Sequence, residues 1–115
     1  MTITLPWPPS VNSYYRTYKN RTILSAAGRK YKKQAAAAIA AKIKKPPQYS
    51  ERLEVTLHLA PPDRKKRDID NFAKATIDAL QAGGIFKDDS QIDRLFIYRL
   101  DVTKKPHVIA QVSII

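Results

Sequence analysis

The chain has 115 residues, of which 21 are Lys or Arg and 10 are Asp or Glu, giving a net charge of +11. Its length fits one domain, and its 43% apolar and 27% charged residues are typical of a globular chain and argue against disorder. Without cysteine, a signal-peptide pattern or an apolar run of about 20 residues, the sequence predicts a disulfide-free, cytoplasmic protein that does not span a membrane.

The first half of the chain is basic throughout. Residues 1–50 contain no Asp or Glu, whereas Lys and Arg recur from Arg16 to Lys45. Such a surface attracts polyanions and gains from the release of their counterions. Solubility alone does not require a half-chain without acids, so a nucleic acid is the favoured partner. An anionic membrane is a weaker alternative, because no basic helix carries large apolar anchors.

The N-terminal half predicts a strand, a hairpin and a helix. Residues 2–5 favour a short strand that ends at the following prolines. Residues 14–18 and 21–24 flank Lys19-Asn20 as the two arms of a hairpin. Ser25 is a suitable N-cap for an alanine-rich helix from residue 26 to about residue 44.

The C-terminal half predicts three more strands and one more helix. Apolar and polar residues alternate over 52–59, as in a half-buried strand. A helix is expected from about Asp70 to Ala82, followed by the stop signal Gly83-Gly84. Residues 92–102 have apolar side chains on both faces and predict a central strand, and 108–114 alternate along a last strand. The expected fold class is α+β, with two helices packed on a small mixed β-sheet.

Acidic residues are scarce, and their positions therefore need an explanation. Asp68 and Asp70 stand two residues apart, directly after the four cations Arg64-Lys65-Lys66-Arg67. Asp88-Asp89 lies in a polar loop that enters the next predicted strand. A helix start and a strand entry can meet in space, so we expect Asp68, Asp70 and either Asp88 or Asp89 to converge.

Converging carboxylates would repel one another, and a hard divalent cation removes that conflict. Mg²⁺ prefers oxygen ligands and commonly binds one or two carboxylates, several waters and a substrate phosphate. With no thiolate and only His58 and His107, far apart in sequence, a zinc site is disfavoured. Carboxylates beside a basic surface therefore indicate phosphodiester hydrolysis, with Lys74 placed one turn after Asp70 to contact the reacting phosphate.

Plainer interpretations exist for each feature. Asp68 or Asp70 would serve as an N-cap, Asp70 and Lys74 as an exposed i, i+4 ion pair, and Asp88-Asp89 as turn residues. In that case the chain is a non-catalytic nucleic-acid-binding module. Trp7 and three tyrosines of the hairpin region, Tyr14, Tyr15 and Tyr18, either stack on unpaired bases or pack in the core.

The order and spacing of several motifs along nearly the whole chain resemble those of the RusA family of Holliday junction resolvases. The motifs are Leu5-Pro6-Trp7-Pro8-Pro9-Ser10 with Asn12 and Tyr14-Tyr15-Arg16; Ser25-Ala26-Ala27-Gly28 with Tyr31; Pro62-Asp63-Arg64; Arg67-Asp68-Ile69-Asp70-Asn71 with Lys74; Asp78-Ala79-Leu80; Asp88-Asp89-Ser90-Gln91; and Val102-Thr103-Lys104. The resemblance implies one RusA-like endonuclease domain over residues 1–115.

The resemblance also implies how such a chain works. It implies a homodimer that binds four-way junction DNA and makes paired symmetric nicks with Mg²⁺, in DNA recombination and repair. Asp68, Asp70 and Asp89 match the essential metal-holding acids of the family, and Lys74 matches its essential lysine. Family members are often encoded by phages or prophages.

The expected DNA-binding residues come from the basic loop and the basic N-terminal half: Arg64, Lys65, Lys66, Arg67, Arg16, Lys30 and Lys33. Besides the non-catalytic module, a metal nuclease that acts on another branched DNA or on RNA stays open as an alternative.

Overall fold

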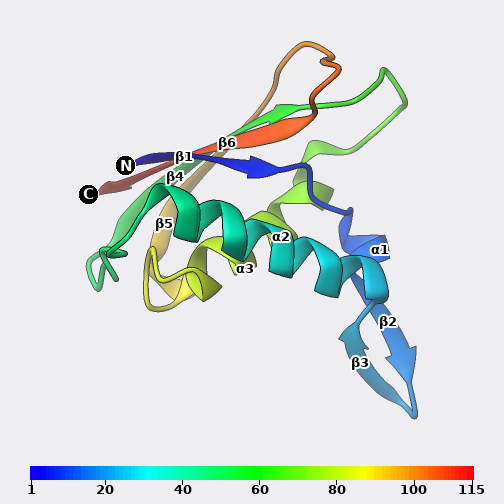
Figure 1. The fold of residues 1–115 in the computed structure, drawn as a ribbon, viewed down its shortest axis with the longest axis horizontal. Helices are drawn as coiled ribbons and strands as arrows, with labels where there is room; N and C mark the ends of the chain where they lie inside the picture. Colours follow the sequence, from blue (N-terminus) through cyan, green and yellow to red (C-terminus); the bar gives the residue numbers. More distant parts are fainter.

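Four strands form the central sheet of the computed structural model, which describes residues 1–115. They lie in the order β1 (Thr2–Pro6), β6 (His107–Ile114), β4 (Leu53–Ala60) and β5 (Ile92–Arg99) (Figure 1). The β1–β6 and β6–β4 pairs are antiparallel, and the β4–β5 pair is parallel. The sheet is therefore mixed, and the expected α+β class is confirmed.

Two helices cover one face of this sheet. Helix α2 (Ala26–Lys42) packs against β1, and α3 (Ala73–Ala82) belongs to the crossover between the parallel strands β4 and β5 (Figure 1). The Ser25 hydroxyl accepts the Gly28 N–H at 2.9 Å, which confirms the expected N-cap of α2. No helix combines the length and the apolar character needed to cross a membrane.

A separate hairpin extends beyond the N-terminal end of α2 (Figure 1). Its strands are β2 (Tyr15–Tyr18) and β3 (Arg21–Leu24), and the turn residues Lys19 and Asn20 both have positive φ. Two consecutive left-handed residues match the twist of a tight hairpin, so the turn forms without a glycine. Tyr14 does not belong to the hairpin, because it ends the short helix α1 (Val11–Tyr14).

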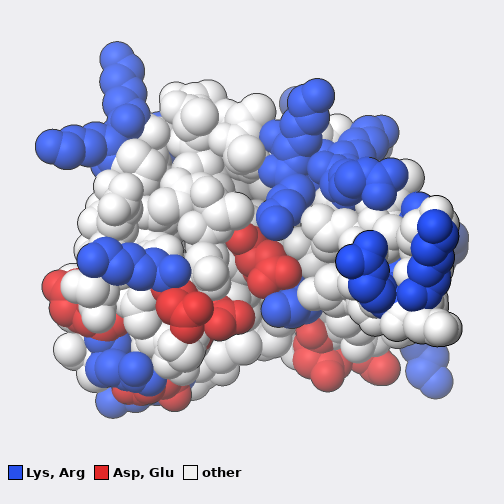
Figure 2. Space-filling model, turned by 90° about the horizontal axis from the view of Figure 1, so that it is seen from below, with Lys and Arg blue, Asp and Glu red and all other residues white.

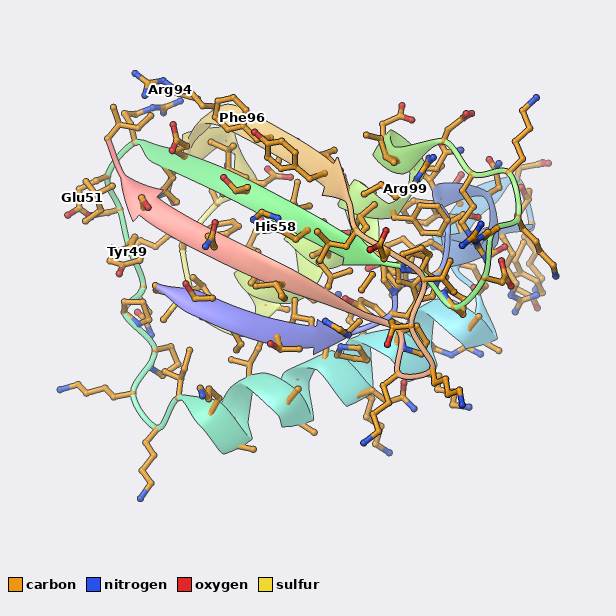
Figure 3. All side chains as sticks on the ribbon, turned by 90° about the horizontal axis from the view of Figure 1, so that it is seen from above. Tyr49, Glu51, His58, Arg94, Phe96 and Arg99 are labelled. Atoms are coloured by element: carbon orange, nitrogen blue, oxygen red, sulfur yellow. The ribbon has the colours of Figure 1, made fainter.

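The core lies between the sheet and the two helices. Strand β4 shows the predicted alternation, with its odd-numbered residues from Leu53 to Leu59 buried. They meet apolar side chains from the neighbouring strands and helices: Ile3, Leu5, Tyr31, Ala35, Ile39, Leu80, Val108, Ala110 and Val112. The opposite sheet face is not covered by a helix (Figure 3).

Two structural expectations need correction. The segment expected to begin a helix at Asp70 starts as a 3₁₀ turn, η1 (Ile69–Phe72), and becomes α-helical only at Ala73. The strand expected to be central is β5, which ends at Arg99 and is an edge strand because it pairs only with β4. Apolar residues on both faces predicted burial on both sides, but in one chain only Ile92 and Ile97 pack against the core, and Leu95, Phe96 and Tyr98 stay exposed.

A buried phenol gives a test of the core. The hydroxyl of Tyr31 is buried and has no partner in hydrogen-bond geometry, although the Thr76 side chain lies near it. Burial raises the Tyr31 pKa to about 12, and Thr76 opposes this rise. An unpaired buried hydroxyl costs about 1–3 kcal/mol. We therefore expect Tyr31→Phe to raise the free energy of unfolding by about 1 kcal/mol, measured by urea denaturation. An unchanged or lower stability would show that the hydroxyl is satisfied.

Candidate active site and nucleic-acid groove

The basic loop after β4 is folded around Asp63. The Asp63 carboxylate accepts the Lys65 N–H at 3.0 Å and pairs with the Arg67 guanidinium at 2.8 Å. Arg67, followed by the Lys65 N–H, lowers the pKa of this carboxyl. Arg99 donates to the Arg67 carbonyl at 2.6 Å, and the Arg67 guanidinium lies 5.7 Å from the centre of the Trp7 ring. These contacts therefore fix the backbone of the loop that carries the four cations.

An open groove of about 700 Å³ lies between this loop and the start of α2. It brings together four of the predicted DNA-binding residues, namely Lys30, Lys65, Lys66 and Arg67. Its other lining side chains include the aromatic rings of Trp7, Tyr31 and Phe72 and the amides of Asn12, Gln34 and Asn71. Cations and amides bind the phosphates of a nucleic-acid strand. Of the three rings only the half-buried Trp7 is open to a base, because Tyr31 and Phe72 are buried.

The other three predicted DNA-binding residues lie outside this groove. Arg64 lines a second cavity of about 510 Å³, and Trp7 borders both. Arg16 belongs to the hairpin, where its guanidinium lies 5.4 Å from the centre of the exposed Tyr18 ring. Lys33 is exposed on α2. The basic surface is therefore wider than the groove.

The hairpin aromatics divide between surface and core. Tyr14 is fully buried, so it packs in the core and cannot stack on a base. Trp7 is half-buried and packs against Phe72, with 5.1 Å between ring centres. Tyr18 is 45% exposed and flanked by Arg16 and Lys19, which makes it the hairpin ring most open to a nucleic acid.

Three of the predicted site acids share an unusual property. The carboxylates of Asp68, Asp70 and Asp89 accept no hydrogen bond and form no ion pair, although the chain has 21 Lys and Arg. Asp101 is in the same condition, whereas the other acids have partners within the chain. The three site acids therefore keep their oxygen atoms free for an external cation.

The N-cap interpretation applies to Asp88 and not to the other acids. The Asp88 carboxylate accepts the Ser90 N–H at 3.0 Å, and Gln91 accepts the Asp88 N–H at 2.7 Å, which forms a capping box on the turn η2 (Asp89–Gln91). Asp68 precedes η1 without a side-chain cap bond. The local roles of Asp68 and Asp70 are thus not explained by capping.

Lys74 forms its ion pair with a different acid from the one considered in the sequence. Its ammonium lies 3.2 Å from Asp78, one turn further along α3, and no ion pair joins it to Asp70. Asp78, followed by contributions that include Asp89, raises the pKa of Lys74. Asp78 in turn lies above the buried Tyr14 phenol, whose pKa is raised first by burial and then by the Asp78 charge. Asp78 belongs to the Asp78-Ala79-Leu80 motif, to which no role was assigned from the sequence.

In one chain, the predicted metal ligands do not come together around one point. Asp68 and Asp70 lie on η1 and Asp89 lies on η2, and no three acidic or imidazole side chains are close enough to surround one ion. The donor set nevertheless suits Mg²⁺, because free carboxylate oxygens are its preferred ligands and one or two of them suffice when waters and a phosphate complete the shell. Figure 2 shows acidic side chains along the middle of the face seen from below, with Lys and Arg on both sides.

Comparisons with known proteins agree with this chemistry. The family profile described as Endodeoxyribonuclease RusA matches residues 6–113. The crossover junction endodeoxyribonuclease RusA of Escherichia coli strain K12 is 40% identical over 103 residues, which cover 89% of this chain and 84% of that protein. The proteins of the same name from Enterobacteria phage 82 and Shigella sonnei are each 39% identical over the same shares. The chain belongs to the RusA family of endodeoxyribonucleases.

Proposed function

We propose that this protein is a Mg²⁺-dependent enzyme that resolves Holliday junctions by paired symmetric nicks, in DNA recombination and repair. The main support is that three carboxylates without partners, Asp68, Asp70 and Asp89, lie in a chain of net charge +11 whose relatives are named crossover junction endodeoxyribonucleases. The relative from Enterobacteria phage 82 further supports the expected phage or prophage origin.

Each group has a proposed task. Asp68, Asp70 and Asp89 are the proposed oxygen ligands, and one or two of them would hold the ion, with waters and a DNA phosphate as the other ligands. A bound Mg²⁺ would supply Lewis-acid stabilisation of the charge that develops on the phosphate. Lys74 neutralises the same phosphate as a compact point charge. The groove cations Lys30, Lys65, Lys66 and Arg67, together with Arg64, Arg16 and Lys33 around them, hold the DNA backbone.

A substrate panel tests this function. We expect the protein to nick a synthetic four-way junction at paired sites in Mg²⁺, and to cut a flap, a linear duplex and an RNA hairpin much more slowly. EDTA should abolish nicking and leave junction binding intact. Preferential cleavage of the flap or the RNA would assign a different nuclease activity, and binding without any cleavage would make the chain a non-catalytic module.

The salt dependence of binding tests the electrostatic part. Each neutralised phosphate lowers the slope of log K against log[salt] by about 0.9. If the four groove cations each contact a phosphate, the slope should be about −3.6 or steeper. Fluorescence anisotropy with a labelled junction between 50 and 200 mM salt measures it, and a flat titration would contradict this use of the groove.

A homodimer completes the proposal. A four-way junction has approximate two-fold symmetry and needs two nicks, whereas one chain carries one set of acids. A dimer with a two-fold axis presents two such sets in symmetric positions. Specificity would then arise from junction shape and phosphate placement more than from base contacts.

A further inference from the structure

Strand β5 is an unprotected sheet edge with large apolar side chains on both faces. Leu95, Phe96 and Tyr98 are 42%, 43% and 51% exposed. The register with β4 places Leu95 beside Val55, on the helix side, and Phe96 beside Thr56, on the open side. Natural edge strands are usually protected by lysine, proline or a covering element, yet residues 95–98 have no charge and no proline.

We propose that β5 is the surface on which a second copy of this chain docks, so that two sheets join edge to edge into one eight-stranded sheet. This inference rests on the proposed function, because paired nicks require two copies of the chain. The exposed edge of β5 indicates where the two copies meet. It also explains the sequence pattern, because β5 would become the central strand that its two apolar faces predict.

The free backbone groups of β5 fit such pairing. The Leu100 N–H donates to the Leu59 carbonyl at 2.8 Å, so even-numbered positions of this segment direct their backbone toward β4. Backbone direction alternates along a regular strand, and Leu95, Ile97 and Arg99 therefore direct N–H and C=O toward the open edge, whereas Asp93 lies at an irregularity of the β4–β5 register. A second β5 in antiparallel orientation would accept and donate at these positions.

Charge selects one symmetric register. With the two-fold axis at Phe96, Asp93 lies opposite Arg99 of the second copy. The Asp93 carboxylate, which already pairs with Arg52 of its own chain, would then have a second cation beside it at each end of the interface. With the axis at Ile97, Asp93 would face Asp101 of the second copy, and these like charges would repel. Figure 3 shows Arg94 and Arg99 toward opposite ends of β5 with Phe96 between them.

The chosen register also gives the apolar residues partners. Leu95 would face Ile97 of the second copy, and the two Phe96 rings would meet at the axis, where aromatic pairs add stability beyond their buried area. The Asp89 turn directly precedes β5. The two Asp89 turns would therefore lie beyond opposite ends of the paired strands, separated by at least the length of eight residues, roughly 26 Å.

Cross-linking tests the register directly, because the chain has no cysteine. Directly opposed residues of an antiparallel pair have Cα atoms about 4.5–5.5 Å apart, within disulfide range. We expect Phe96→Cys to form a disulfide-linked dimer on oxidation and Tyr18→Cys, an equally exposed aromatic position on the hairpin, to form none. No dimer at position 96, or equal cross-linking at both positions, would overturn the proposal.

Oligomeric state gives the second test and separates it from the proposed function. Sedimentation should show a wild-type dimer, a monomer for Phe96→Asp and a dimer for Ile114→Asp, an exposed apolar control on β6. Asp93→Arg should weaken dimerisation, and Asp93→Arg with Arg99→Asp should restore it. A junction-nicking protein whose Phe96→Asp variant stays dimeric refutes only the interface, whereas a β5-linked dimer that never nicks junctions refutes only the function.

Discussion

Asp70→Asn should abolish junction nicking while leaving the fold and junction binding intact. The Asp70 carboxylate has no hydrogen-bond or ion-pair partner within the chain, so its replacement by an amide removes no internal contact. It removes one negatively charged oxygen ligand, and metal stabilisation of the transition state is worth several kcal/mol. We therefore expect a loss of about 10³-fold or more in the single-turnover nicking rate.

Junction affinity should stay equal or rise in the same variant, because one negative charge is lost beside DNA phosphates. Anisotropy in EDTA measures that affinity without cleavage. Asp101→Asn is the matched control, since Asp101 is the other acid without a partner and lies in the loop after β5. Equal nicking by wild type and Asp70→Asn would remove Asp70 from the reaction, and equal losses in both variants would point to a general charge effect.

Local signals predicted most elements of the fold correctly. The alternation along β4, the Ser25 cap and the glycine stop after α3 each depend on neighbouring residues only, and the structure contains all three. Gly84, with a φ of 83°, takes the left-handed conformation that the stop signal requires. The hairpin turn at Lys19-Asn20 was also predictable from its flanking β-formers.

Features that depend on distant residues were less predictable. The position of β5 in the sheet depends on which strands pair. Its sequence pattern is typical of a central strand buried on both faces, but in one chain β5 lies at the edge of the sheet. The distance between η1 and η2 depends on the path of residues 83–91, so spacing alone could not show whether the acids surround one ion. Asp70 and Asp78 lie at equal sequence distance from Lys74, one on each side. Lys74 pairs with Asp78 because Asp70 belongs to the 3₁₀ turn and not to the α-helix that carries Lys74 and Asp78.

Lys74→Met should lower the nicking rate by about 10²–10³-fold, the usual effect of removing one group that stabilises developing charge. The Lys74 ammonium is partly exposed and held 3.2 Å from Asp78, with Asp89 adding to the rise in its pKa. The ion pair with Asp78 therefore orients the Lys74 ammonium. Junction binding should change little, because one surface cation contributes only one phosphate contact.

Two further variants separate charge from position. Lys44→Met removes one exposed cation in the loop after α2 and should leave the nicking rate within about two-fold, as expected for a surface substitution. Asp78→Asn keeps Lys74 but removes the carboxylate that holds it, so nicking should fall less than in Lys74→Met. If Lys74 serves only as a structural partner of Asp78, the two variants should lose equal activity and equal stability. If Lys74 acts on the phosphate, Lys74→Met should lose far more activity than Asp78→Asn at a similar free energy of unfolding.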